Sequence, residues 1–147
     1  MKLQVCWIGK SKNPQIESWC REYQKRLLRY LPIDLRPLQN EAALLKLVKS
    51  SAGRRAPTVV LLDIRGKQLS SEELAKFVSD QQDRGTQELL FGIGPADGFT
   101  EAVRQAATFV LSLSKMTIAH ELARALLLEQ LYRAFTILKG HPYHTGH

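Results

Sequence analysis

Three glycines follow an apolar run in LLFGIGPADGF, residues 89–99, and this stretch is the first candidate for a binding site. Glycine accepts positive φ angles and lets a ligand approach bare backbone, which suits a nucleotide or nucleoside. Two tight turns between a strand and a helix would explain Gly92, Gly94 and Gly98 equally well. The loop therefore has to be interpreted together with the rest of the chain.

The spacing of these glycines disfavours the two common nucleotide-binding loops. A dinucleotide fingerprint needs Gly-x-Gly-x-x-Gly after the first strand of a βαβ unit and an acidic residue about 20 positions further on. Here Gly98 comes one residue too late, and residues 110–118 contain no Asp or Glu. No Gly-Lys-Ser/Thr follows, so a Walker phosphate loop is excluded as well. The pattern thus argues against a nicotinamide-dependent enzyme.

Two further segments place polar and flexible residues at the end of an apolar run. They are LLDIRGK, residues 61–67, and LSLSKMT, residues 111–117. Ligands of open α/β sheets bind outside the carboxyl ends of the strands. We therefore expect both segments and the glycine loop to meet at one edge of a sheet.

The carboxyl-terminal stretch GHPYHTGH offers groups for proton transfer. A zinc site built from His141, His144 and His147 is disfavoured, because their spacing in a proline-interrupted tail presents no common face and no Cys or acidic cluster joins them. We predict no metal. A disordered tail without a function is the alternative to a catalytic one.

The apolar pattern predicts a single α/β domain over residues 1–147. Short apolar runs predict five strands, at about 3–8, 33–38, 57–63, 87–93 and 109–114. Helical spacing predicts a first, basic helix that buries Ile16, Trp19, Cys20, Tyr23, Leu27 and Tyr30. Further helices are expected at about 41–52, at 70–84 with a Ser70/Glu73 capping box, after Thr100, and at 118–138. This alternation favours a mainly parallel sheet with helices on both faces.

The last predicted helix is apolar on more sides than one sheet can cover, up to Gly140, which is suited to ending it. We expect this helix to form a homodimer interface, with deep burial inside one subunit as the alternative. Glu129 and Arg133 are four residues apart in it, as an ordinary surface pair or as a partly buried pair where two subunits meet.

The net charge of +7 is concentrated in the amino-terminal part of the chain. Residues 1–55 hold 12 Lys and Arg against 4 Asp and Glu, whereas residues 56–147 hold 9 against 10. Such a surface suits a polyanion, although it also suits a merely solvated surface. No apolar stretch is long enough for a membrane span or a signal-peptide core, so we expect a cytoplasmic protein. Cys6 and Cys20 are interpreted as buried free thiols.

Four stretches, in order along the chain, are similar to one known family. MKLQVCWIGK, VVLLDIRGK, FGIGPADGF and LSLSKMTIAHELARALLLEQLYRAFTILKGHPYH resemble the ribosomal RNA large-subunit methyltransferase H family, of the SPOUT class. The resemblance implies an α/β fold whose carboxyl-terminal part forms a deep trefoil knot. It also implies a homodimer, S-adenosylmethionine as cofactor, and methylation of N3 of a pseudouridine in large-subunit (23S) ribosomal RNA, with the assembled ribosome as the expected substrate. A non-catalytic RNA-binding or ribosome-associated factor is the alternative.

The resemblance assigns residues to three roles. The cofactor would contact Leu62, Gly94, Leu113, Ser114, Lys115, Met116, Thr117 and Ile118. Tyr143 and His144 would lie at the target nucleotide, with Arg133 anchoring a phosphate or the partner subunit. A sequence-independent grip on RNA is expected from Lys10, Lys12, Arg21, Lys25, Arg26 and Arg29.

Because a uracil-type N3 carries a proton at neutral pH, we expect a base or a group that stabilises the anion within hydrogen-bond reach of it. We expect His144 to assist removal of this proton, or to order a water that does, while Tyr143 stacks on or hydrogen-bonds the base. His120 is expected to be structural. Two residues depart from the family pattern: Pro95 replaces a second glycine and removes an N–H donor, and Ala119 replaces a proline at the entry to the last helix.

Overall fold

The computed structural model describes residues 1–147 except 11, 50–54, 96 and 145–147. The strands are β1 (Lys2–Ile8), β2 (Ile33–Leu38), β3 (Thr58–Gln68), β4 (Glu88–Ile93) and β5 (Phe109–Ser112). The helices are α1 (Pro14–Leu27), α2 (Glu41–Val48), α3 (Ser71–Asp83), α4 (Glu101–Gln105) and α5 (His120–Lys139). Within these described ranges no helix is long and apolar enough to cross a membrane.

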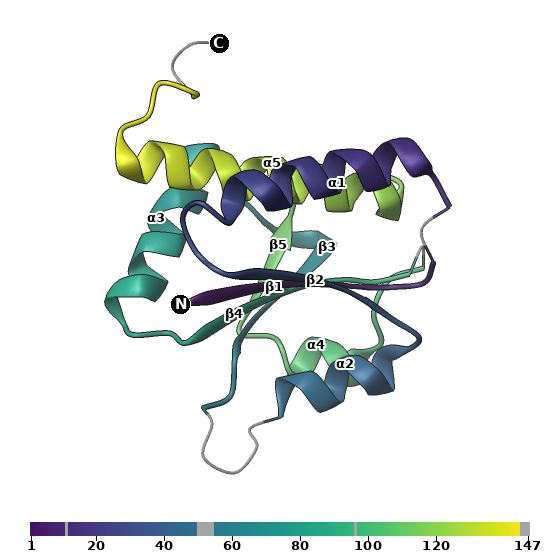
Figure 1. The fold of residues 1–147 in the computed structure, drawn as a ribbon. Coiled ribbons are helices and arrows are strands. Elements are labelled where there is room, and N and C mark those ends of the chain that lie inside the picture. Colours follow the sequence, from purple (N-terminus) through teal and green to yellow (C-terminus); the bar gives the residue numbers. More distant parts are fainter. Residues whose placement is uncertain (11, 50–54, 96, 145–147) are drawn as a thin grey trace.

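The five strands form one parallel sheet in the order β2-β1-β4-β3-β5. Helices α1, α3 and α5 cover one face, and α2 and α4 cover the other (Figure 1). The predicted α/β fold, with a parallel sheet between two helical layers, is therefore confirmed. Because β4, β3 and β5 are neighbours and parallel, the loops after them emerge at the same edge of the sheet.

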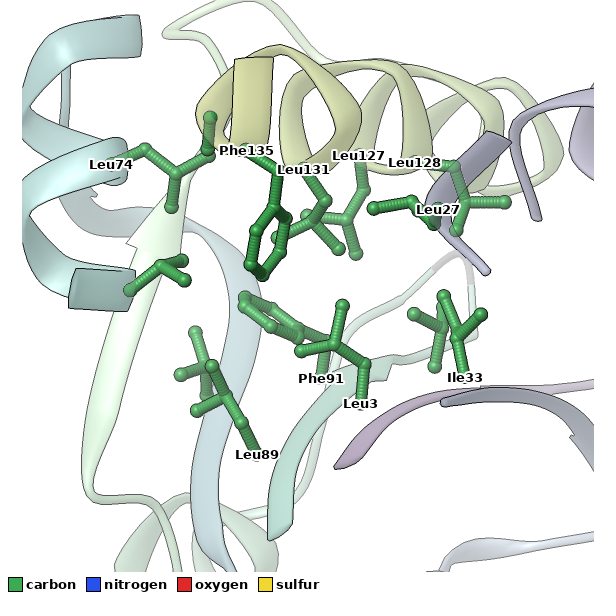
Figure 2. Close-up of a cluster of buried hydrophobic side chains, with 14 of the residues drawn as sticks. Leu3, Leu27, Ile33, Leu74, Leu89, Phe91, Leu127, Leu128, Leu131 and Phe135 are labelled. Atoms are coloured by element: carbon green, nitrogen blue, oxygen red, sulfur yellow. The ribbon is translucent and has the colours of Figure 1, made fainter. Parts of the chain in front are cut away.

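Alternate residues of the strands bury against the two helical layers. Figure 2 shows Leu131 and Phe135 of α5 packed towards Leu3 of β1 and Phe91 of β4, all of them fully buried. A smaller cluster on the other face includes Leu44 of α2. The period of two in the strand side chains explains why both faces of this sheet are apolar.

Helix α1 differs from its predicted burial at one residue. Cys20 and Leu27 are buried, but Trp19 is 61% exposed. Its neighbour Cys20 is buried against the sheet. Successive residues of a helix are about 100° apart around the helix axis, so the Trp19 side chain lies outside the buried face. The prediction that Trp19 is buried was wrong, although its ring lies near that of Tyr23, with 6.4 Å between the centroids.

Most of the apolar surface of α5 is buried inside the subunit. The α5 side chains of Leu127, Leu128, Leu131 and Phe135 are fully buried in the core between this helix and the sheet. Only Leu122, Leu126 and Leu138 stay exposed among its large apolar residues, by 45%, 40% and 36%. The alternative of intramolecular burial thus accounts for most of the helix, and the homodimer stays a prediction.

Strand β3 is longer than the predicted 57–63, because the polar segment after Leu62 rejoins the sheet. Leu111 of β5 lies opposite both Leu62 and Lys67, so residues 63–66 bulge out of the pairing. Gly66 lies directly against the β5 backbone, where a Cβ would come within 2.7 Å of the Val110 carbonyl group. Only a residue without a side chain fits this crossing.

Helix ends follow the predicted capping signals. The Ser70 hydroxyl accepts the Glu73 N–H at 3.0 Å, and the Glu73 carboxylate accepts the Ser70 N–H at 2.8 Å, so the capping box is confirmed. Gly140 ends α5 at a φ of +70°. Cys6 and Cys20 are buried free thiols, as predicted, and burial raises the pKa of Cys6 to about 11.

The start of α5 gives a test of stability. Ala119 is its N-cap, with a φ of −53° and ψ of 134° and without a side-chain cap. Because proline is restricted to φ values near −65°, Ala119→Pro should stabilise the fold by about 0.4–1 kcal/mol by narrowing the unfolded ensemble. Urea unfolding of the variant and of the wild-type protein measures the change. A lower stability of Ala119→Pro would mean that the N–H of this residue is needed.

Candidate functional site

An open cleft of about 720 Å³ lies at the carboxyl edge of the sheet. Leu62 at the β3 bulge, Gly94 after β4 and Met116 after β5 all line it. The three segments that the sequence placed together therefore converge. Of the eight expected cofactor residues, seven line the cleft: Leu62, Gly94, Leu113, Ser114, Met116, Thr117 and Ile118. Lys115 is exposed and does not line it.

The glycine loop is shaped by packing against Phe99. A Cβ on Gly94 would come within 3.1 Å of the Phe99 ring, which is buried behind the loop. Gly98 has a φ of +86°, and its N–H donates to the Pro95 carbonyl at 2.8 Å. Pro95 lines the cleft itself. The loop thus contains a turn, closed by the Gly98–Pro95 hydrogen bond, and also lines the cleft. Pro95 takes part in both.

The loop after β5 is fixed by its own hydroxyl groups. Ser112 donates its hydroxyl to the Ser114 carbonyl at 2.9 Å, and Met116 donates its N–H to the Ser114 hydroxyl at 2.9 Å. Met116 itself is 79% exposed at the mouth of the cleft. These bonds use the hydroxyl groups of Ser112 and Ser114 to hold the loop in its local structure.

Sequence reasoning missed the charged wall of the cleft. Asp63 and Arg65 on the β3 bulge, Arg104 on α4 and His120 at the start of α5 all line it. The motif LLDIRGK contains the signal for Asp63 and Arg65, but nothing in the sequence links them to Arg104. His120 was expected to be structural, yet it lies in the cleft lining.

Asp63 is held ionised although its side chain is only 8% exposed. Its Oδ1 accepts the Arg65 backbone N–H at 2.9 Å and Nε at 3.3 Å, and Arg104 Nη2 lies 3.5 Å from Oδ2. Burial alone would raise the pKa of Asp63, but the hydrogen bonds from Arg65 outweigh it and the pKa is lowered. The cleft therefore contains a fixed negative charge between two guanidinium groups.

The tail packs on the carboxyl-terminal part of α5. Tyr143 donates its hydroxyl to Glu129 at 3.2 Å, and the Arg133 guanidinium lies 4.8 Å from the centre of the Tyr143 ring. Arg133 is bound to Glu129 through Nε at 3.0 Å and Nη2 at 2.5 Å, with both side chains less than one-fifth exposed. Burial, the Tyr23 hydroxyl and Glu129 raise the pKa of Tyr143, which keeps the phenol protonated.

His144 is held between a cation and an anion. Arg133 Nη1 lies 3.2 Å from Nδ1, and Glu72 Oε1 lies 2.8 Å from Nε2. Because a guanidinium can only donate and a carboxylate can only accept, this arrangement assigns the lone pair to Nδ1 and the proton to Nε2. Nη1 is the one guanidinium nitrogen of Arg133 that is not bound to Glu129.

The tail and the cleft lie at opposite ends of α5. His120 and Ala123 line the cleft, whereas Arg133 lies ten residues further along, about 15 Å at a rise of 1.5 Å per residue. In Figure 1 the tail leaves α5 on the side where the chain begins, away from the carboxyl ends of the strands. The cleft lining includes neither Tyr143 nor His144. Within one subunit, the predicted catalytic residues and the predicted cofactor residues do not meet.

The basic residues expected to bind RNA are not equivalent. Arg21 and Lys25 on α1 and Arg29 in the turn after it follow one another at intervals of four and are exposed, as are Lys10 and Lys12 before the helix. Arg26 is half-buried, paired with Glu22 at 3.0 Å, and its guanidinium lies 5.2 Å from the centre of the Tyr23 ring and 5.5 Å from that of Tyr132. Arg26 is thus built into the packing between α1 and α5. His147 lies outside the described residues, within which no cluster of three or more His, Cys, Asp or Glu side chains could hold a metal ion.

Comparisons with known proteins agree with this architecture. A family model described as "Predicted SPOUT methyltransferase" matches residues 1–144. Ribosomal RNA large subunit methyltransferase H of Koribacter versatilis is 55% identical over 147 residues, which is 100% of both chains. The protein of the same name from Geotalea daltonii is 43% identical over 152 residues, covering 98% of this chain and 99% of its own.

Among solved structures, a probable methylase family protein from Haemophilus influenzae has a TM-score of 0.59 at 13% identity. The match covers 98% of this chain and 69% of that one, and it supports the fold. The chain therefore belongs to the SPOUT methyltransferase family and, within it, to the family of ribosomal RNA large subunit methyltransferase H.

Proposed function

We propose that this protein transfers a methyl group from S-adenosylmethionine to N3 of a pseudouridine in large-subunit ribosomal RNA. The observation that carries the proposal is the convergence of Leu62, Gly94 and Met116 on one cleft. The relatives named as ribosomal RNA large subunit methyltransferase H support the substrate class. We further propose that the chain acts as a single domain, in the cytoplasm, on the assembled ribosome.

The lining of the cleft fits the cofactor. Its volume of about 720 Å³ lies in the usual range for small-molecule sites. Leu62, Ile93 and Ile118 offer an apolar surface for a nucleoside, and Gly94 adds backbone that carries no side chain of its own. The Nε of Arg104 is buried and has no hydrogen-bond partner among the described residues. When bound, S-adenosylmethionine supplies an electrophilic methyl group on a sulfonium.

The chain's own task is to orient the base and to remove its N3 proton. While Nε and Nη2 of Arg133 keep the ion pair with Glu129, an RNA phosphate that binds Nη1 would take the place of the His144 ring and move it away. This movement frees the Nδ1 lone pair of His144 to accept the proton, directly or through water. Tyr143, held protonated, offers a hydroxyl and a ring face to the base.

A homodimer would bring the two halves of the site together. The tail lies far from the cleft of its own subunit, and exposed apolar side chains flank the cleft: Met116, Leu122 and Leu126. We propose that these side chains pack against a second copy, and that the tail of one subunit completes the cleft of the other. Two-fold symmetry then produces two equivalent composite sites.

The deep trefoil knot belongs to the same proposal. It is supported by the family and by the pairing of β5 on the outer side of β3, where residues 63–66 bulge and Gly66 lies against the β5 backbone. A threaded chain would fix the three loops of the cleft relative to one another. It would thereby orient the bound cofactor before the RNA arrives.

Calorimetric titration with S-adenosylmethionine tests the proposed function. Saturable binding with one site per subunit is expected, and Gly94→Val should abolish it because a branched side chain would collide with Phe99 and displace the loop that lines the cleft. No binding at millimolar cofactor would favour the alternative of a non-catalytic ribosome-associated factor.

The exposed basic residues of α1 and of the turn after it lead to a separate prediction. Reversing three exposed charges, in Arg21→Glu/Lys25→Glu/Arg29→Glu, should raise the KM for ribosomes and flatten its salt dependence, because fewer counterions are released on binding. Steady-state kinetics at several salt concentrations measures both effects. Cofactor affinity should not change, and an unchanged KM with an unchanged salt dependence would show that these residues do not bind RNA.

A further inference from the structure

The charged wall of the cleft has no role in the reaction described above. Asp63, Arg65 and Arg104 come from two separate elements, β3 and α4, and all three line the cleft. Arg65 is 62% exposed and bends back onto Asp63 through both its backbone and its side chain. The remaining pair, Asp63 and Arg104, therefore presents one anionic and one cationic group side by side inside the cleft.

Both members of this pair have hydrogen-bonding capacity left for a ligand. The Asp63 carboxylate takes its short bond, from the Arg65 backbone N–H at 2.9 Å, on Oδ1, whereas the contacts of Oδ2 are long, 3.3 Å to Arg65 Nη2 and 3.5 Å to Arg104 Nη2. Arg104 is 27% exposed, its Nη1 lies 3.9 Å from the exposed Glu101, and its buried Nε has no partner within the described part of the chain. A Cβ at Gly98 would lie 3.9 Å from Arg104 Nη2, so the glycine loop passes beside the guanidinium.

An adjacent carboxylate and guanidinium complement an amino-acid zwitterion. The α-ammonium group needs an anionic acceptor, and the α-carboxylate needs a donor with fixed geometry, which a guanidinium provides. S-adenosylmethionine ends in such a zwitterion. We infer that Asp63 accepts hydrogen bonds from the α-ammonium group and that Arg104 donates to the α-carboxylate at the methionine end of the cofactor. The inference rests on the proposed function and assigns an orientation to the cofactor.

This orientation divides the cleft into two parts. The methionine end lies at the wall formed by Asp63 and Arg104, and the nucleoside lies against the apolar residues Leu62, Ile93 and Ile118. A purely structural ion pair between β3 and α4 is the competing explanation. The two explanations differ in which ligand contacts the pair affects. A structural ion pair would support binding of every part of the ligand, whereas a recognition pair would contribute only to binding of the methionine end.

Two ligands that differ only at the methionine end separate these explanations. S-adenosylhomocysteine carries the zwitterion, and methylthioadenosine has the same nucleoside and sulfur without it. Calorimetry on the full-length protein should show that Arg104→Met weakens S-adenosylhomocysteine binding by about 10- to 100-fold, the usual effect of a charge-assisted hydrogen bond. Methylthioadenosine affinity should change less than about twofold. Asp63→Asn should weaken binding of the two ligands in the same pattern. Arg36 is an exposed residue of β2, so Arg36→Met is the matched control and should affect neither ligand.

Three results would overturn the inference. Equal losses for both ligands in both variants would identify the pair as a structural brace. Wild-type protein that binds methylthioadenosine as tightly as S-adenosylhomocysteine would show that the zwitterion is not recognised, while the cofactor assignment would stand. Wild-type protein that binds neither ligand would remove the cofactor assignment and this inference with it. Retained methylthioadenosine binding also proves that a variant is folded, because it needs an intact cleft.

Discussion

His144→Ala should lower kcat by at least about 100-fold, which is the usual contribution of a positioned general base. The Nδ1 of His144 carries the lone pair that now faces Arg133 Nη1, and the substitution removes the group that we propose takes the N3 proton. Affinity for S-adenosylmethionine should not change, because His144 is assigned to the N3 proton of the base and not to the cofactor. Single-turnover methylation of ribosomes, together with calorimetry, separates these two quantities.

A mixed dimer tests where His144 acts. Neither His144→Ala nor Gly94→Val should support turnover alone. Co-expression of the two should restore about half of the wild-type activity per mixed dimer, since one of its two composite sites then has an intact tail and an intact cleft. Wild-type turnover by His144→Ala, with normal cofactor binding, would exclude His144 from the chemistry. A mixed dimer without activity would contradict the exchange of tails.

Arg124→Ala should destabilise the fold by about 3–5 kcal/mol, the range for removing one member of a buried ion pair or a large core side chain. Arg124 is only 1% exposed, its Nη2 donates to Glu17 at 2.6 Å, and its guanidinium lies 3.9 Å from the centre of the Trp7 ring. These contacts join α1 and β1 to the first turns of α5. The helix end that they fix is the one that lines the cleft.

Urea unfolding measures this loss, with Arg36→Ala as the control. Arg36 is exposed on β2, so its truncation should change stability by less than about 0.5 kcal/mol. Addition of S-adenosylhomocysteine should recover part of the stability of Arg124→Ala, since binding to the folded state stabilises it. Equal stability of the two variants would mean that Arg124 is not part of the core.

The fold and the location of the cleft could be predicted from the sequence, because both depend on patterns among residues that are close together in the chain. Apolar runs and helical spacing report which residues are buried, and the parallel sheet brings Leu62, Gly94 and Met116 to one edge. The capping box at Ser70 and the helix end at Gly140 were predictable because each depends on a few neighbouring residues.

The features that were missed depend on contacts between distant parts of the chain. The charges of Asp63 and Arg104 are typical of a solvated surface, and only the fold brings β3 and α4 together around them. Arg124 is buried for the same reason, because Glu17 and Trp7 reach it from other elements. Periodicity predicted a buried Trp19, but it cannot locate the edge of the sheet beyond which the side chain becomes exposed.

The central claim is that this cleft supplies a methyl group to one base of the ribosome. Purified protein and S-adenosylmethionine with an isotopically labelled methyl group should be incubated with ribosomes and with free ribosomal RNA from cells that lack the gene. Mass spectrometry of the digested RNA should find the label on N3 of a pseudouridine of the large subunit, with assembled ribosomes as the better substrate. Absence of label from both substrates, or label on another base, would contradict the account.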